Sequence, residues 1–283
     1  MNRSRVICEI SKSPWAFFAL VFALSLPVWL IGPLVDRLAP GATSINLPAS
    51  ALMFVCPISA ALILVQRQEG WDGVRRLLKR GFDLRRIESA IWYLPILLLV
   101  PSIIVVQHGV ADPARIVAPG PPFPFWMVLV WCLVFLVAAV GEELGWQGYA
   151  VDLLLGRWNA LTASVVLGMV WAGWHVVPLI QLGANPTRIA GQCIDMVATR
   201  ILIVWLYRNT GKSVFAAVLY HAMYNVSTLL LPSYGLHYDP VMVCIFAAGA
   251  AALVTFLWGP ETLAHYRYAR ADKRVHLAKE EIK

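Results

Sequence analysis

Eight long apolar runs dominate this sequence and limit it to one kind of fold. Each run has 18 to 21 residues, and a helix that crosses the hydrocarbon core of a bilayer needs about 20 mostly apolar residues. With 59% hydrophobic and 14% charged residues, the composition is also far from that of a water-soluble domain. We therefore expect an all-α, polytopic membrane bundle that forms one domain over residues 1–283. The expected spans are Trp15–Val35, Leu47–Gln66, Ala90–Gln107, Phe123–Gly141, Leu161–Ile180, Ile189–Tyr207, Val214–Leu231 and Val241–Trp258.

The basic residues predict how this bundle is oriented. If the N-terminus is cytoplasmic, 19 of the 23 Lys and Arg residues fall in cytoplasmic segments, and only Arg37, Arg115 and Arg188 fall outside. This asymmetry is the positive-inside pattern, and it places both termini in the cytoplasm. The net charge of +7 is thereby explained by membrane topology, so we do not expect a nucleic-acid partner.

Two basic segments flank the apolar runs on the predicted cytoplasmic side. Residues 67–88 alternate apolar and basic side chains at roughly helical spacing, which is typical of a segment lying in the plane of the lipid headgroups. We expect it to anchor the chain to anionic lipid, with a role in docking substrate as the alternative. Residues 260–283 form a basic cytoplasmic tail. The lipid bilayer is therefore the first expected partner.

Two adjacent carboxylates, Glu142 and Glu143, stand at the end of the fourth apolar run. A carboxylate inside a bilayer is costly unless it is paired or hydrated, so two together indicate a function. On an α-helix Glu142 shares a face with Trp146, whereas Glu143 shares the next face with Gln147, four residues on. We expect aromatic side chains around Glu142 and support from Gln147 for Glu143. A buried pair that only joins helices remains the structural alternative.

Glycines mark a further face of the same helix. Gly141, Gly145 and Gly148 form a narrow stripe of small residues, and such stripes allow another transmembrane helix to approach closely. We therefore expect a helix to pack tightly behind the glutamates.

Three later runs supply the other polar groups. The fifth contains Trp171 and His175, four residues apart, and the seventh contains His221 and Asn225 at the same spacing. The sixth contains Arg200, for which a carboxylate on the fourth run, Glu143, is the preferred partner. Packing roles for these groups remain possible, because polar side chains also join transmembrane helices.

These groups together predict hydrolysis of an amide without a covalent nucleophile. A glutamate and a histidine can share the deprotonation of a water, while a second histidine and an asparagine receive the negative charge on a carbonyl oxygen. No GxSxG or GxxxxGK[ST] motif is present. The groups meet at one depth only if the fourth helix continues past Gln147 into 149–155 or if the fifth helix begins outside the hydrocarbon. Of these two we predict a long fourth helix.

The three motifs resemble those of the CAAX protease and bacteriocin-processing family, also called CPBP or Abi. The resemblance covers roughly residues 120–230 and rests on Glu142-Glu143-x-x-x-Gln147, Trp171-x-x-x-His175 and His221-x-x-x-Asn225, in that order. It implies an intramembrane endopeptidase in which Glu142 and His175 activate water and His221 with Asn225 forms the oxyanion hole. The catalytic candidates are thus Glu142, Glu143, His175, His221 and Asn225, supported by Gln147, Trp146, Trp171 and Arg200.

The resemblance leaves the question of a metal open. Family members are often labelled metalloproteases, which implies a possible divalent ion such as zinc, and its ligands here would be Glu142, His175 and His221. The familiar HExxH arrangement is absent, and a glutamate with histidines can also act on water directly. No cofactor is therefore expected with certainty.

Two residues depart from the family pattern. The first motif usually ends in arginine, where this chain has Gln147, and the second usually begins with phenylalanine, where it has Trp171. Trp171 keeps an aromatic wall and should change little. Gln147 removes a cation beside Glu143, and pairing of Glu143 with Arg200 is the hypothesis that would replace it.

Two alternatives to a peptidase follow from the same residues. One is an inactive, immunity-type relative that binds a peptide or a partner membrane protein, which Gln147 favours. The other is a proton-coupled carrier, which ranks last because no internal repeat of the kind transporters use is visible. For the peptidase we expect a peptide or membrane-protein substrate and a multi-pass location in the plasma membrane, the inner membrane of a bacterium.

Overall fold

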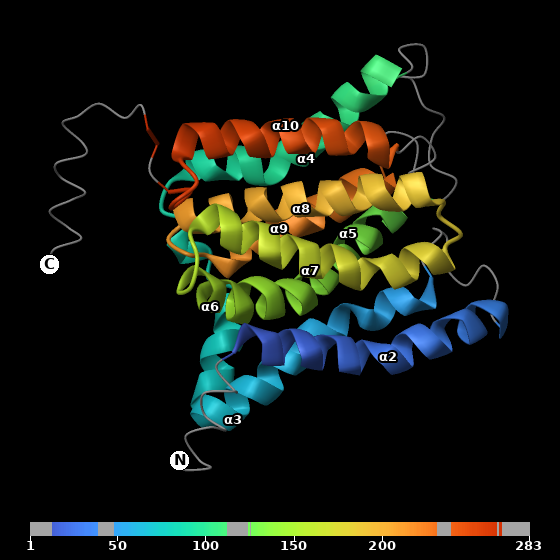
Figure 1. Cartoon of the computed structure of the whole chain (residues 1–283), viewed down its shortest axis with the longest axis horizontal. Helices are drawn as coiled ribbons and strands as arrows, with labels where there is room; N and C mark the ends of the chain where they lie inside the picture. Colours follow the sequence, from blue (N-terminus) through green and yellow to red (C-terminus); the bar gives the residue numbers. More distant parts are fainter. Residues whose placement is uncertain are drawn as a thin grey trace, which may run out of the picture.

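The computed structural model describes residues 13–38, 48–111, 124, 126–230, 239–264 and 266–267, and every regular element in these ranges is helical. Short helices connect the long ones at the ends of the bundle (Figure 1). The elements are α2 (Pro14–Leu38), η1 (Ala49–Phe54), α3 (Val55–Arg80), η2 (Leu84–Arg86), η3 (Ala90–Trp92), α4 (Tyr93–Ala111), α5 (Trp126–Gly145), η5 (Trp146–Ala150), α6 (Val151–Leu155), α7 (Ala160–Gln181), α8 (Pro186–Asn209), α9 (Val214–Leu230) and α10 (Pro240–Trp258).

Eight long helices correspond to the eight predicted spans, and the all-α membrane bundle is confirmed. Within the described ranges seven helices are long and apolar enough to cross a membrane. The eighth, α9, has 17 described residues and is followed by residues outside the described ranges. The first helix begins and the last ends at the same end of the bundle (Figure 1). Which end is cytoplasmic stays a prediction from the charges.

The helices form a closed ring. Each helix packs against two neighbours, in the order α2, α3, α5, α9, α4, α10, α8, α7 and back to α2, and α8 also contacts α9 across the ring. The four helices that carry the candidate residues, α5, α7, α8 and α9, therefore surround the middle of the bundle. Polar side chains that would be costly against lipid can meet there.

The predicted long fourth helix is confirmed, with one irregularity. The helical run extends from Trp126 to Leu155, 30 residues, but its segment Trp146–Ala150 is a π-helix. A π-helical turn closes hydrogen bonds from residue i to i+5 and holds more residues than an α-turn, so side chains beyond it change face. The segment begins three residues after Glu143.

The predicted headgroup segment begins with a break in α3. Gly70 has φ 66° and ψ −163°, which interrupts the helix between the apolar part and the basic part, and glycine adopts such angles without steric cost. Beyond it Trp71 and Phe82 are exposed, as are Arg75 and Arg76. Their position in the headgroup plane stays a prediction. The tail beyond residue 267 lies outside the described residues.

Candidate active site

The glycine stripe determines how α5 is rotated in the bundle. A Cβ at Gly141 would lie 2.8 Å from the ring of Phe54, and one at Gly145 would lie 2.6 Å from the backbone carbonyl of Pro57. No side chain fits at these distances, so α5 packs directly against η1 and the start of α3, as the stripe predicted. The same contact turns Glu142 and Glu143 away from α3 and toward α7, α8 and α9.

Glu143 is the anchor of a fully buried ion pair. Its Oε2 accepts a hydrogen bond from Arg200 Nη1 at 2.7 Å, and its Oε1 lies 2.8 Å from His221 Nδ1. The side chains of Glu143 and Arg200 have no exposed surface, and His221 is 2% exposed. The predicted pairing of Glu143 with Arg200 is confirmed. It ties α5 to α8 and α9 at one point.

Glu142 has a different partner on a different helix. Its Oε2 accepts a hydrogen bond from Trp171 Nε1 on α7 at 2.8 Å. The guanidinium of Arg200 lies over the Trp171 ring, 4.3 Å from its centroid, an arrangement that attracts a cation to the π face. Trp171 was expected to serve only as an aromatic wall. Its indole N–H also orients Glu142, and its ring links the two glutamates through Arg200.

The two histidines are held in one orientation by their Nδ1 atoms. His175 Nδ1 lies 2.9 Å from the carbonyl oxygen of Trp171, and because a carbonyl can only accept, this nitrogen carries the proton. His221 Nδ1 faces a carboxylate already paired with an arginine, so it too carries the proton. In both rings Nε2 has no hydrogen-bond partner among the described residues. The Trp171 ring stands edge-on to both, with centroids 5.1 Å from His175 and 5.3 Å from His221.

The side chains of this cluster differ sharply in how exposed they are. His175 and Asn225 are partly exposed, Glu142 is 6% exposed, and Glu143 and Arg200 are sealed. The side-chain amide of Asn225 makes no hydrogen bond to another described residue. His175 and Asn225 are therefore the most exposed of these side chains, and Glu143 and Arg200 are the least exposed.

The predicted support of Glu143 by Gln147 is wrong. Gln147 is fully buried, and neither its Oε1 nor its Nε2 has a hydrogen-bond partner in the described part of the chain. The π-helical segment accounts for the error, because Gln147 lies inside it and loses the α-helical register with Glu143. Trp146 packs edge-on against Phe17 and Trp174. Trp174 in turn contacts the ring of His175, at 4.8 Å between centroids.

Sequence reasoning missed a polar network at the end of the bundle beside the π-helical segment. Arg80 donates to the carbonyl of Gly148 and to the hydroxyl of Tyr207, and Tyr207 donates to Asp152 at 2.8 Å. Lys212 adds an ion pair to Asp152 at 3.1 Å. Arg80 was assigned to the headgroup segment with its neighbours. The signal that could have found the network is Asp152, a lone acid in an apolar helix that needs a cation nearby.

The residues offered as metal ligands do not form a ligand set in this geometry. Among the described residues no three His, Cys, Asp or Glu side chains lie together as a metal site requires, the group Glu142, His175 and His221 included. We therefore derive no step of the chemistry through a metal.

Comparison with known proteins gives two matches. The model of a family described as Type II CAAX prenyl endopeptidase Rce1-like matches residues 124–227, the part of the chain that contains all three motifs. The CAAX prenyl protease 2 of Methanococcus maripaludis is 23% identical over 239 residues, which cover 80% of this chain and 88% of that protein. With the buried cluster of glutamates and histidines in a helical membrane bundle, these matches support a CAAX-protease-like peptidase that is similar to the CAAX protease and bacteriocin-processing family.

Proposed function

We propose that this peptidase cleaves a peptide bond with a water molecule activated by Glu142 and His175. The observation that carries the proposal is the orientation of His175, whose Nδ1 is bound to the Trp171 carbonyl so that Nε2 presents a lone pair. A base in this state can take a proton from water as the oxygen attacks the carbonyl carbon. Glu142, fixed by the indole of Trp171, accepts the second hydrogen bond of the same water.

The negative charge that develops on the carbonyl oxygen of the substrate must be stabilised by hydrogen-bond donors other than Glu142 and His175. We assign this role to His221 Nε2 and the amide of Asn225, one turn apart on α9. His221 can donate from Nε2 while Nδ1–H is bound to Glu143 only as an imidazolium, so this proposal requires both ring nitrogens of His221 to carry a proton when the oxyanion forms. Glu143 and Arg200 are then positioning residues. The proton taken by His175 passes to the leaving amine when the intermediate collapses.

The substrate class follows from the setting. A cluster inside a membrane bundle suits a peptide or membrane protein presented from the bilayer. The archaeal relative is named a CAAX prenyl protease. For this chain we propose a peptide substrate of a membrane-attached protein, with the need for a prenyl group decided by experiment. A location in the plasma membrane of a bacterium belongs to the same proposal.

The alternative, an inactive relative that binds a peptide or a partner protein, had its support in Gln147. That support weakens because Arg200 reaches Glu143 from α8 and supplies the cation that Gln147 lacks. The alternative still predicts a distinct outcome, in which peptide binds but is not cleaved.

The test uses the purified full chain in phospholipid vesicles with a peptide library that includes prenylated and unmodified members. We expect cleavage by the wild type, loss of at least about a hundredfold in Glu142→Gln and His175→Ala, and no change in Glu261→Gln, an exposed acid outside the cluster. Trp171→Phe keeps the aromatic wall but loses the bond to Glu142. It should reduce cleavage by about two- to tenfold, as expected for one hydrogen bond.

The same assay with a chelator distinguishes hydrolysis that needs a metal ion from hydrolysis that does not. Cleavage that persists after chelation supports water activation by the protein groups alone, and loss that zinc restores would require a metal at the cluster. Binding without cleavage by the wild type for every peptide would overturn the peptidase mechanism and favour the binding alternative.

A further inference from the structure

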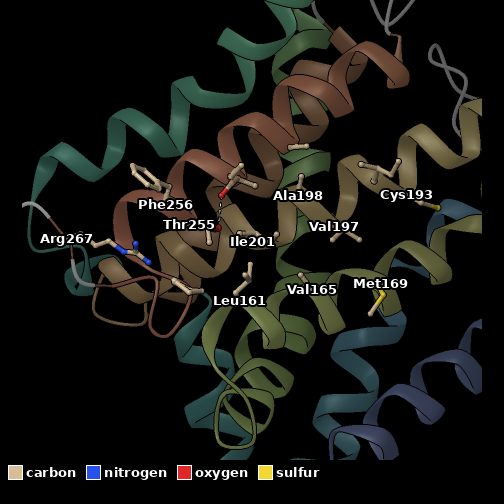
Figure 2. Close-up of a pocket in the computed structure, with 15 residues that line it drawn as sticks. Leu161, Val165, Met169, Cys193, Val197, Ala198, Ile201, Thr255, Phe256 and Arg267 are labelled. Carbon is tan, nitrogen blue, oxygen red and sulfur yellow. Dashed lines mark hydrogen bonds between the residues drawn. The ribbon is translucent and has the colours of Figure 1, made fainter.

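An open apolar groove lies on the surface of the bundle. It lies between α7, α8 and α10, has a volume of about 860 Å³, and is lined by apolar side chains with two exceptions, Thr255 and Arg267. The hydroxyl of Thr255 donates to the Ala251 carbonyl on its own helix, so the groove receives no free polar group from it. In Figure 2 the lining side chains extend from Arg267 at one end of the groove to Met169 and Cys193 at the other.

The length of the groove is close to the thickness of one leaflet. Along α7 it extends from Leu161 to Met169, and along α8 from Cys193 to Ile201. Eight residues of helix span about 12 Å, whereas half of the hydrocarbon core of a bilayer is about 15 Å. A single acyl chain that enters from one surface of the membrane would therefore lie along its whole length.

The end of the groove at Arg267 is constructed by the turn that follows α10. Gly259 adopts φ 78°, and a Cβ there would lie 3.2 Å from the Nε of Arg267, so glycine leaves the room that the arginine occupies. The backbone N–H of Arg267 donates to the Leu257 carbonyl at 2.8 Å and holds the residue against the end of α10. This turn directs a cation to the mouth of the groove.

Arg267 has no counterion within the described residues. It is exposed, and it forms no ion pair with the exposed carboxylate of Glu261, six residues before it. Aromatic rings mark the same level of the bundle, since Trp258 contacts Tyr266 at 5.1 Å and Trp205 at 5.1 Å between centroids. Trp and Tyr are typical of the headgroup level of a membrane protein. The guanidinium is therefore placed where lipid phosphates lie.

We propose that this groove is a binding site for an anionic phospholipid of the leaflet at that end, with an acyl chain between α7, α8 and α10 and the headgroup phosphate on Arg267. A guanidinium with no counterion among the described residues, at the polar end of an otherwise apolar groove, matches that chemistry in charge, and the groove matches it in length. A lipid of the bilayer fits better than the lipid anchor of a substrate, because no lining residue belongs to the catalytic cluster. Val197 and Ile201 face the groove, whereas Arg200 between them extends to Glu143 on α5.

The experiment uses the full chain in phosphatidylcholine vesicles with photoactivatable lipids that carry a diazirine in the acyl chain. Crosslinks are mapped by mass spectrometry for a phosphatidylglycerol probe and, separately, for a phosphatidylcholine probe. We expect the phosphatidylglycerol probe to label α7, α8 and α10 about fivefold more than the phosphatidylcholine probe, the preference that one interfacial cation supplies. Arg267→Ala should lower this ratio to about one, whereas Arg157→Ala, an exposed arginine that does not line the groove, should leave it unchanged.

A second variant tests the apolar part. Ala248→Phe places a ring in the groove from a partly exposed position on α10, and it should reduce labelling by both probes several-fold. Equal labelling by the two probes in the wild type would overturn the headgroup assignment. Labelling of the groove by a prenylated peptide probe and not by either phospholipid would overturn the proposal in favour of a substrate anchor. If Ala248→Phe fails to fold, the ratio measured for Arg267→Ala decides the question.

Discussion

The two faces of α8 show how differently a membrane protein treats polar and apolar side chains. On one face Arg200 reaches into the cluster with Glu143, Trp171 and His221, where three other helices converge. On the other, Val197 and Ile201 line a groove of about 860 Å³ that none of the described residues fills. The residues are neighbours in sequence, so one short stretch of helix meets two different environments.

The physical difference lies in the solvent. Lipid tails are as apolar as leucine, so an apolar side chain gains little when it exchanges lipid for protein. A polar group gains a great deal, because it has no hydrogen-bond partner in hydrocarbon. We infer that the cluster around Glu143 fixes the relative positions of α5, α7, α8 and α9, whereas the groove tolerates change. The predictions below test that inference.

The largest effect is expected when the buried ion pair is broken. Arg200→Met leaves the carboxylate of Glu143 without the guanidinium that binds it at a site with no exposed surface. Removal of one partner of a buried pair costs about 3–5 kcal/mol, so we expect a loss of that size in the free energy of unfolding and no cleavage. Reversible unfolding in mixed micelles gives the first quantity and the peptide assay gives the second.

Two further variants show whether the loss belongs to the pair. The double variant Glu143→Gln with Arg200→Met removes both charges and should lose less than the sum of the single changes, by about 0.5–3 kcal/mol. Arg267→Ala, an arginine at the groove, should change stability by no more than about 0.5 kcal/mol. Equal losses in Arg200→Met and Arg267→Ala would contradict the contrast between the two faces.

An intermediate effect is expected at the glycine contact behind the glutamates. Gly145→Ala adds a methyl group that would lie 2.6 Å from the Pro57 carbonyl, and extra atoms in a packed contact cost about 1–3 kcal/mol. Displacement of α5 should also misplace Glu142 and reduce cleavage. The measurements are the unfolding temperature and the rate of cleavage.

Gly249→Ala is the matched control on α10, close to the groove. A Cβ at Gly249 meets nothing within 4 Å, and alanine in a helix interior is about 0.5–1 kcal/mol more favourable than glycine. We expect an unchanged or higher unfolding temperature and normal cleavage. A comparable fall in both variants would show that the two regions tolerate substitution equally.

The sequence predicted the parts of this architecture that depend on composition and regular spacing. Eight apolar runs gave the helices, the glycine stripe gave the packing of α5, and the need of a buried carboxylate for a cation gave the pair of Glu143 with Arg200. It could not predict the π-helical segment Trp146–Ala150. The wider turn is a change in backbone hydrogen bonding, and no periodic pattern of side-chain types in the sequence accompanies it. The hydrogen bonds of Trp171 to Glu142 and of His221 to Glu143 could not be predicted either, because they depend on how α7 and α9 are rotated.

The smallest change in the free energy of unfolding is expected when Gln147 is replaced, and the sign of that change is informative. Both amide atoms of Gln147 are buried without a partner among the described residues, and an unsatisfied buried polar group costs free energy rather than supplying it. Gln147→Met keeps an unbranched side chain of similar size, so stability should stay within about 1 kcal/mol of the wild type or rise. Cleavage should persist, because Arg200 and not Gln147 holds Glu143. A loss as large as that of Arg200→Met would instead mean that Gln147 bonds within the cluster in the working enzyme, and that the π-helical segment changes its register there.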